Sequence, residues 1–397
     1  MRIIYFSHTF FSDCDFPLIS ELEKQGHEVF AYYHLSSWEL NAGLVEISNQ
    51  PSRDGIIPAS EYKEMQVYKD FVNLDHVFFI NNPHSRRFHL QKRLVWLKMF
   101  WHMKKWHADV VQITWQLRDW ETLLFKLGIP VVMTVHDPFQ HSSRFSKETE
   151  EFRMKSFSRS RKLILLNQGM KSDFESHYMV PSDKVAVSKL GEYSHIRLFK
   201  ADKCKFTEKP FVLFFGLISK YKGIKYLVEA MDALHDAYPD IDLVIIGRGD
   251  IDFDISQYEK RGYLKFINRF ASSEELATLL QQCMFAVCPY TDATQSGVVQ
   301  TAFSAGCPLI VTNVGNLPKA VADNVNGLVV NPSDSADLAR AMESLFKNPE
   351  RLIDFRHNIE ESWQKSMSWE PIAKDYIQVY KDALKSISDK RYKAYKN

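Results

Sequence analysis

Two loops of the 397-residue chain combine small residues with the start of a predicted helix, a pattern that binds anions. The first follows an apolar strand in FFGLISKYKGIKYLVEAM (214–231) and contains Gly216, Ser219 and Lys222. Backbone N–H groups at a helix N-terminus favour negative charge, and a lysine on the same loop adds a full positive charge. We therefore expect Lys222 to contact a phosphate. Taken alone, the stretch also fits a solvated lysine beside turn glycines.

The second loop lies in PYTDATQSGVVQTAFSAGCPLIVTN (289–313), between a strand and a helix that begins near Gly297. Gln295, Ser296 and Gly297 offer free backbone donors at the helix start, and open α/β sheets bind ligands at the carboxyl ends of their strands. Two such loops in one half of the chain indicate a diphosphate site. A serine N-cap with structural glycines is the alternative for this stretch alone.

A histidine marks the end of another predicted strand. PVVMTV (130–135) leads directly into His136, and Asp137-Pro138 turns the chain away. The imidazole is thus expected at the carboxyl edge of a sheet, where ligands bind. A lone histidine at a strand end is more often a structural hydrogen-bonding residue, so both roles stay open from the residues alone.

The segment 76–108 contains no Asp or Glu. Its cations are Arg86, Arg87, Lys92, Arg93, Lys98, Lys104 and Lys105, and its apolar residues at helical spacing are Leu90, Leu94, Leu97 and Trp101. A basic helix of this kind over 84–107 fits an anionic membrane surface. It equally fits a helix whose apolar stripe packs on a sheet while its cations are solvated. No aromatic-platform motif accompanies the cations, so no nucleic acid is expected.

Apolar strands alternate with helical stretches along the chain, which predicts an α/β fold with two parallel sheets. The first series of strands lies at 2–6, in the apolar run between Gly26 and residue 35, and at 109–113, 130–135, 162–166 and 184–188. The second series lies at 211–218, 242–247, 265–268, 285–290, 309–313 and 327–330. The polar stretch 199–210 is the predicted linker, and 369–397 has the spacing of a closing helix.

Composition narrows the class of protein. The formal net charge is +1, 45% of residues are hydrophobic, and the five Cys form no CxxC pair. These values exclude disorder, a disulfide framework and a zinc knuckle, and they favour a reducing cytoplasm. No signal-peptide core or apolar run long enough to span a membrane is present. We expect a cytoplasmic protein, or one that lies on the inner face of a membrane.

The run from about 211 to 380 resembles the donor-binding half of GT-B glycosyltransferases of the family-4 type. The matching segments are FFGLISKYKGIKYLVEAM, DLVIIGRGD, FAVCPY followed by SGVVQTAFSAGCPLIVTNVGNLPKAV, DNVNGLVVNPSDSADLARAM and MSWEPIAKDYIQVY. The resemblance implies two Rossmann-like parallel-sheet domains facing a central cleft. It places an acceptor-side domain at 1–205, a nucleotide-sugar donor domain at 206–375, and a closing helix at 376–397 that returns to the N-terminal domain.

The resemblance also implies an activity: a hexosyltransferase-type enzyme that moves a sugar, with retention of configuration, from a nucleoside-diphosphate donor. The acceptor is a glycan or a lipid-linked molecule, and neither a cofactor nor a metal is required. Two other classes stay open at this point. They are a nucleotide-sugar epimerase of the same architecture and a nucleotide-sugar-binding subunit with weakened catalysis.

Carried over to this chain, the family's pattern makes Lys222 the lysine that neutralises the diphosphate and places His136 near the donor sugar. Backbone donors of Ser296, Gly297 and Val298 would receive the phosphate or the sugar. The residues that would frame the nucleotide base are Asn268, Arg269 and Phe270.

The chain departs from the family at three positions. The pair of glutamates separated by seven residues falls on Ala293 and Thr301, so neither carboxylate is present, and an arginine common in the family is replaced by Leu217. We expect Thr301 to contact the ribose with one neutral hydroxyl in place of a charge-assisted carboxylate.

Overall fold

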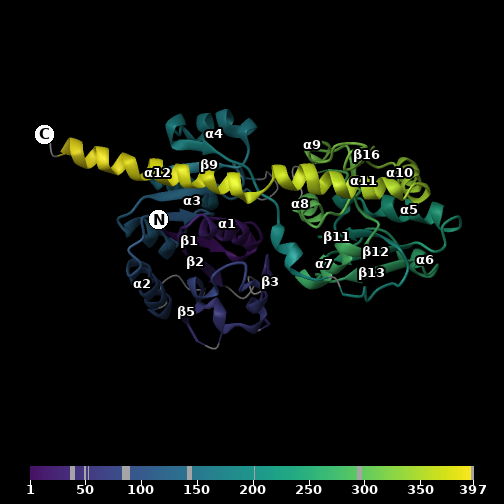
Figure 1. Ribbon diagram of the computed structural model, residues 1–397, viewed down its shortest axis with the longest axis horizontal. Helices are drawn as coiled ribbons and strands as arrows, with labels where there is room; N and C mark the ends of the chain where they lie inside the picture. The colour runs from purple at the N-terminus through teal and green to yellow at the C-terminus, as the bar shows by residue number, and fades with distance from the viewer. Residues whose placement is uncertain are drawn as a thin grey trace. The chain divides into compact units, whose positions relative to one another are not determined.

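The computed structural model (Figure 1) describes residues 1–35, 41–48, 51, 53–82, 90–140, 145–200, 202–292 and 297–394. The chain forms two compact units, which we call unit 1 (Met1–Gly191 with Ser368–Asn397) and unit 2 (Glu192–Met367). Each unit has its own sheet and its own hydrophobic core. The division falls after Gly191, whereas the sequence placed it after residue 205, and the return to unit 1 begins at Ser368, whereas the sequence placed it at 376.

Unit 1 contains an eight-stranded sheet with the order β10-β9-β8-β7-β1-β2-β6-β5. Its pairs are parallel except β5 with β6. The strands are β1 (Arg2–His8), β2 (Glu28–Leu35), β5 (Gly55–Pro58), β6 (Val77–Asn81), β7 (Val110–Ile113), β8 (Val131–Val135), β9 (Lys162–Leu165) and β10 (Val185–Val187). A separate antiparallel pair joins β3 (Asn41–Ala42) to β4 (Val45–Glu46).

The helices of unit 1 are α1 (Ser12–Lys24), α2 (Leu90–Lys104), α3 (Lys147–Arg159), α4 (Lys171–Tyr178) and the C-terminal α12 (Trp369–Ala394). The strands between them are buried along most of their length, as expected for a parallel sheet with helices on its faces. Figure 1 shows α12 (yellow) running alongside unit 1, where it contacts α1, β8 and β9.

Unit 2 contains a six-stranded parallel sheet with the order β13-β12-β11-β14-β15-β16. Its strands are β11 (Phe211–Phe215), β12 (Asp242–Gly247), β13 (Leu264–Asn268), β14 (Phe285–Cys288), β15 (Leu309–Thr312) and β16 (Gly327–Val330). Its helices are α5 (Ile224–His235), α6 (Ser256–Glu259), α7 (Ser273–Gln282), α8 (Gly297–Ser304), α9 (Leu317–Ala320), α10 (Ser335–Lys347) and α11 (Glu350–Asn358). The order reverses between β11 and β14, as in a doubly wound nucleotide-binding sheet.

The predicted strands of both series are present, and the two-sheet α/β fold is confirmed. The sequence analysis missed β5 and β6. Strand β6 lies inside the acid-free segment, and all five of its residues are buried. It pairs with β2 on one side and β5 on the other. Its strand conformation is therefore stabilised by residues distant in the sequence, and the helical spacing of the residues that follow it gave no sign of a strand.

Helix α12 is anchored to unit 1 by buried aromatic side chains. The Tyr376 hydroxyl is hydrogen-bonded to Thr134 Oγ1 on β8 at 3.0 Å. Trp369, at the start of the helix, is 7% exposed. A Cβ atom at Gly191 would lie 2.4 Å from Trp369 Cε2, so this glycine is required by the indole ring and not by its own backbone conformation.

We expect Gly191→Ala to destabilise unit 1, because the indole of Trp369 must shift to admit a methyl group. The cost of overpacking of this kind is about 1–3 kcal/mol. The thermal unfolding temperature measures it, and Gly169→Ala is the matched control, since its nearest neighbour is a side-chain oxygen of Asn167 at 3.3 Å. Equal unfolding temperatures for the two variants would contradict the proposed anchor.

Candidate functional site

The loops after β11 and β14 meet at the carboxyl edge of unit 2, where the strand order reverses. Gly223, in the left-handed conformation at φ +64°, lies so close to the second loop that a Cβ atom would be 1.9 Å from the Pro289 oxygen. The Thr291 backbone N–H donates to the Tyr221 oxygen at 2.8 Å. Direct backbone contact thus joins the two loops that the sequence identified separately.

Gly216 continues the β11 ladder and brings its loop against β12. Its N–H donates to the Ile246 oxygen at 3.1 Å, and Ile218 forms a bridge with Gly249. A Cβ atom at Gly216 would lie 3.3 Å from Val298 Cγ2, at the start of α8. The N-terminus of α8 therefore lies beside the first loop. Gln295 and Ser296, like Ala293, lie outside the described residues.

Lys222 is a cation without a carboxylate partner in the part of the chain that the structure describes. Its Nζ lies over the Tyr290 ring, 3.6 Å from the centroid, and 5.0 Å from the centroid of Tyr221. Burial lowers the pKa of Lys222 to about 8, because the charged form has lost part of its hydration. An anion at this position would replace that lost hydration.

Ser219 and Thr301 are the two hydroxyl residues proposed for this site. Ser219 Oγ is buried and has no hydrogen-bond partner among the described residues, so its hydroxyl group is left unpaired. Thr301 Oγ1 donates to the Gly297 oxygen within α8 at 2.8 Å. Its only hydrogen is therefore used, and Thr301 can serve a ribose only as an acceptor.

The three residues after β13 differ in their freedom to bind a base. The side-chain amide of Asn268 forms two hydrogen bonds with the Gly249 backbone. Its Oδ1 accepts from the Gly249 N–H at 3.1 Å, and its Nδ2 donates to the Gly249 oxygen at 2.9 Å. Arg269 forms a two-pronged ion pair with Glu275 at 2.7 and 2.8 Å. Phe270 is 62% exposed. Phe270 therefore presents an exposed ring, with the Arg248 guanidinium 5.9 Å from its centroid, whereas Asn268 and Arg269 hold the loop in shape.

In unit 1, His136 follows β8 at the carboxyl edge of the sheet, as the sequence predicts. Its ring stacks on Phe11, with ring centroids 4.2 Å apart and planes at 23°. Shielding from water lowers the pKa of His136 to about 4. His136 Nε2 has no hydrogen-bond partner in the described part of the chain. At neutral pH this residue is therefore an uncharged imidazole with one buried, unpaired ring nitrogen.

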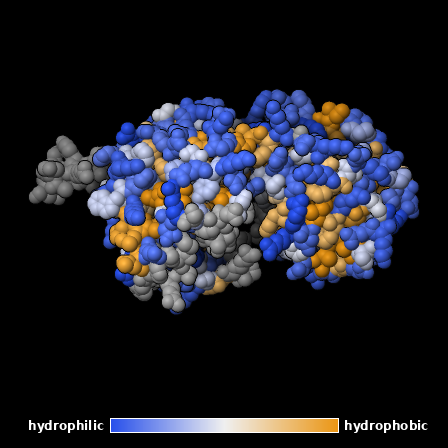
Figure 2. Space-filling view, turned by 90° about the horizontal axis from the view of Figure 1, so that it is seen from below, coloured by the Kyte–Doolittle hydropathy of each residue, from blue (hydrophilic) through white to orange (hydrophobic). Residues whose placement is uncertain are grey.

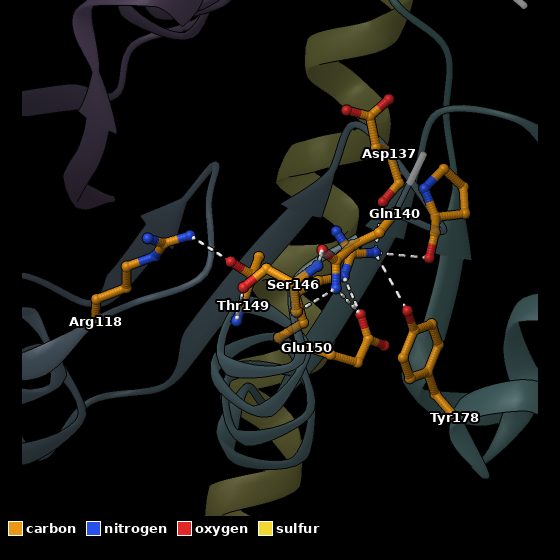
Figure 3. Close-up of polar contacts among 9 residues, drawn as sticks. Arg118, Asp137, Gln140, Ser146, Thr149, Glu150 and Tyr178 are labelled. Atoms are coloured by element: carbon orange, nitrogen blue, oxygen red, sulfur yellow. Dashed lines mark hydrogen bonds and ion pairs between the residues drawn. The ribbon is translucent and has the colours of Figure 1, made fainter. Parts of the chain in front are cut away.

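The loop that follows His136 is held by a buried arginine on α3. Arg153, 4% exposed, donates from Nη2 to the oxygens of Asp137 and Pro138, both at 2.7 Å. Gln140, at the end of this loop, is bonded to α3 as well, and Figure 3 shows the network. These contacts fix the backbone on one side of His136, so the imidazole is positioned before any ligand arrives.

Sequence reasoning missed a group of aromatic residues at the same edge of unit 1. Phe10 and Phe11 lie in a short turn after β1, and Trp115 follows β7; their ring centroids lie between 4.5 and 5.9 Å apart. The signal was present, because SHTFF and ITW place these rings directly after predicted strands. The strand-end argument that selected His136 applies to them equally.

Two family models match the chain in tandem. The model described as Glycosyl transferases group 1 matches residues 196–365, and that described as Glycosyltransferase Family 4 matches residues 17–191. The first range lies within unit 2 and the second within unit 1.

Among the described residues, no group of three or more His, Cys, Asp or Glu side chains could hold a metal ion.

Relatives match parts of the chain. A protein of Methanocaldococcus jannaschii described as an uncharacterized glycosyltransferase is 26% identical over 240 residues, which are 56% of this chain and 60% of the relative. A D-inositol 3-phosphate glycosyltransferase of Paenarthrobacter aurescens is 24% identical over 281 residues, 66% of this chain and 69% of the relative. The chain thus spans 60–69% of the length of these two relatives.

Solved structures share the fold over nearly the whole chain. Sucrose-phosphate synthase from Thermosynechococcus elongatus has a TM-score of 0.65 at 16% identity, covering 97% of this chain and 100% of its own. UDP-GlcNAc 2-epimerase from Neisseria meningitidis has a TM-score of 0.61 at 15% identity, covering 95% and 100%. Anabaena HepE, in complex with UDP and glucose, has a TM-score of 0.57 at 16% identity, covering 98% and 100%.

The pKa of Lys222 leads to a pH-dependent affinity for anions. Because this pKa is about 8, Lys222 loses its charge above that pH, and the affinity for inorganic pyrophosphate should fall as pH rises from 7 to 9. We expect Lys222→Met to bind more weakly at pH 7 and to show a smaller fall. Titration calorimetry of wild type and Lys222→Met measures both affinities across this pH range. Pyrophosphate itself changes its ionisation in the same way in both experiments, so the difference between the two proteins reports on Lys222. Lys220→Met, an exposed lysine on the same loop, should behave as wild type.

The same pKa predicts the effect of pH on stability. Between pH 8 and the usual lysine pKa of 10.5, the folded protein binds fewer protons at Lys222 than the unfolded chain does. The contribution of Lys222 to the free energy of unfolding therefore rises with pH in this window. Unfolding temperatures of wild type and Lys222→Met should converge as pH increases from 8 to 10. A constant difference would contradict the lowered pKa.

Proposed function

Because the chain belongs to the GT-B glycosyltransferases of the family-4 type, we propose that it transfers a sugar from a nucleoside-diphosphate donor to a glycan or lipid-linked acceptor, with retention of configuration. The observation that carries this proposal is Lys222, a partly buried cation with no carboxylate partner in the described chain. It lies on the same loop as Gly216, which is beside Val298 at the start of α8. A dianionic or trianionic diphosphate is the ligand that such a site neutralises.

In the proposed donor complex, unit 2 holds the diphosphate. Lys222 contacts the phosphate oxygens, the backbone N–H groups of Gly297 and Val298 at the start of α8 receive further oxygens, and Ser219 Oγ donates a hydrogen bond. Phe270 offers an exposed ring on which a base can stack. Thr301 accepts from a ribose hydroxyl. The diphosphate is thus held by a charged side chain and helix dipoles, whereas the nucleoside is held by weaker, neutral contacts.

Unit 1 contributes an aromatic surface and a neutral imidazole to the proposed reaction. The rings of Phe10, Phe11 and Trp115 form an aromatic surface at its carboxyl edge, and His136 Nε2 is available to bond a hydroxyl group. Sugars present both apolar C–H faces and hydroxyl groups, so such an edge suits a sugar or a glycan acceptor. We assign His136 the role of positioning a sugar hydroxyl, since its neutral form carries no charge to stabilise an anion.

The proposed chemistry is substitution on one face of the sugar. The bond between the anomeric carbon and the diphosphate oxygen breaks as the acceptor oxygen bonds to the same carbon, and the acceptor proton passes to the departing phosphate. The transition state resembles an oxocarbenium ion, so its main demand on the protein is to stabilise the leaving diphosphate. Lys222 meets that demand, and no protein nucleophile or cofactor is required.

We expect Lys222→Ala to lower kcat/KM for sugar transfer by about 10- to 100-fold, the usual loss for a charged hydrogen bond. The donor is first identified by thermal-shift screening against UDP-, GDP- and ADP-sugars, and the HepE complex makes UDP-glucose the first to be tried. Lys220→Ala, on the same loop but exposed, is the matched control. Full activity of both Lys222→Ala and His136→Ala would overturn the assignment.

The role of His136 can be separated from general-base catalysis by its pH dependence. Because the pKa of His136 is about 4, the pH–rate profile should show no inflection from this residue near 6.5. We expect His136→Gln, which retains a hydrogen-bonding amide, to keep more activity than His136→Ala. A wild-type inflection near pH 6.5 that disappears in His136→Gln would instead assign His136 as the base.

The epimerase alternative makes a different product from the same donor. An epimerase needs no acceptor, so incubation with the nucleotide-sugar alone distinguishes the two activities. We expect free nucleoside diphosphate only when an acceptor, or water in its place, is consumed. An epimerised nucleotide-sugar formed without an acceptor would replace the transferase proposal.

A further inference from the structure

Helix α2 (Leu90–Lys104) has two apolar faces, and unit 1 uses only one of them. The buried face joins the hydrophobic core through Val95, Trp96, Met99 and Met103. The opposite face carries the stripe that the sequence analysis noticed, which we call the outer stripe. Its members and their exposed fractions are Leu90 (68%), Leu94 (47%), Leu97 (41%) and Trp101 (65%). The structure thus excludes one of the two alternatives for this stripe, that it packs on the sheet, because a different face of α2 packs inward.

The outer stripe is continuous along the helix. With about 100° of rotation per residue, its four side chains fall within an arc of about 60°, opposite the buried face. Figure 2, seen from below Figure 1, shows apolar side chains (orange) gathered on the part of unit 1 where α2 lies in Figure 1. Contiguous exposed apolar residues of this kind mark an interaction surface more often than scattered ones do.

Cations flank the outer stripe on both sides. By the same rotation, Lys98 and Lys105 fall on one side of it, and Arg93 and Lys104 on the other. Within the described residues, Lys98, Lys104 and Lys105 form no ion pair with a carboxylate. The Nζ atom of Lys104 instead lies 5.4 Å from the Trp101 ring centroid.

Acidic side chains near the stripe are few. Segment 76–108 has none, and the neighbouring η5 (Asp119–Lys126) contributes Asp119 and Glu121. Glu121 is 7% exposed, and its carboxylate accepts from the Arg118 N–H at 2.8 Å. The surface around the stripe is therefore positive as well as apolar. Residues 83–89 and the side chain of Lys92, which the sequence analysis included, lie outside the described residues.

We propose that the outer stripe of α2 docks on an anionic lipid surface. Leu and Trp side chains would enter the interface between headgroups and acyl chains, while the flanking cations contact lipid phosphates. Charge complementarity selects this partner, because an apolar stripe with cations on both sides and no acidic residue on its own helix matches an anionic bilayer. No helix in the described part of the chain is long and apolar enough to cross a membrane, so the helix lies along the surface. The inference stands whether or not the chain transfers a sugar.

The experiment is co-sedimentation of the full chain with vesicles of phosphatidylcholine alone or mixed with phosphatidylglycerol. Wild type should bind the mixed vesicles, and the binding should weaken with added salt. We expect the triple change Lys98→Gln, Lys104→Gln and Lys105→Gln to lower the partition coefficient about a hundredfold, since each cation contributes about fivefold. A triple change at exposed lysines of unit 2, Lys205→Gln, Lys260→Gln and Lys319→Gln, alters the net charge equally and should not lower it.

A second pair of variants tests the apolar contribution. Leu94→Gln with Leu97→Gln should lower binding to mixed vesicles, whereas Val325→Gln with Ile353→Gln, exposed residues of unit 2, should not. Unfolding temperatures and nucleotide-induced thermal shifts should stay at wild-type values in all variants, which separates this inference from the proposed activity. Equal binding to both vesicle types, no binding by wild type, or a dimer that dissociates on the Leu94/Leu97 changes would overturn it.

Discussion

Parallel pairing of β11 with β12 on one side and β14 on the other is the constraint on which the unit 2 site depends. Since these strands end at the same edge, the loops that follow β11 and β14 are brought together there. Their contact is closer than any side chain would permit, because a Cβ atom at Gly223 would overlap the Pro289 oxygen. Lys222 is therefore positioned by backbone packing and by the ring of Tyr290, and no carboxylate among the described residues pairs with it.

The same strand order gives unit 1 an edge of opposite character. His136 is neutral because its pKa falls to about 4, and burial raises the pKa of Asp15, beneath the site, to about 8. Asp15 is thus largely a neutral acid at pH 7, and it accepts a hydrogen bond from the Tyr5 hydroxyl at 2.7 Å. In the proposed complex, the aromatic rings and His136 of unit 1 recognise a sugar by shape and stacking, with Lys189 lining the same pocket, whereas Lys222 of unit 2 provides charge for the diphosphate. On this proposal, two sheets of similar topology differ in binding chemistry through the residues that follow their strands.

The sequence predicts most of the fold because buried parallel strands appear as short apolar runs between helical stretches. It also places Lys222 on a loop between a strand and a helix, and His136 at a strand end, where the structure has them. It could not assign the faces of α2, since Leu94 and Val95 are equally apolar and only tertiary contact decides which is buried. Nor could it show that Asn268 and Arg269 are occupied by Gly249 and Glu275, because both bonds depend on how loops fold back on one another.

The absent glutamates change how a nucleotide would be held. A carboxylate on α8 would accept two ribose hydroxyl groups at full charge, whereas Thr301 offers one neutral oxygen whose hydrogen already bonds the Gly297 carbonyl. The loss would fall on the nucleoside, while the diphosphate contacts proposed for Lys222 and the α8 N-terminus would be unaffected. Binding should therefore depend mostly on the diphosphate and discriminate little through the ribose. In the proposed complex, base recognition would then rest on exposed surfaces such as Phe270, because an aromatic ring stacks on any base and does not select one.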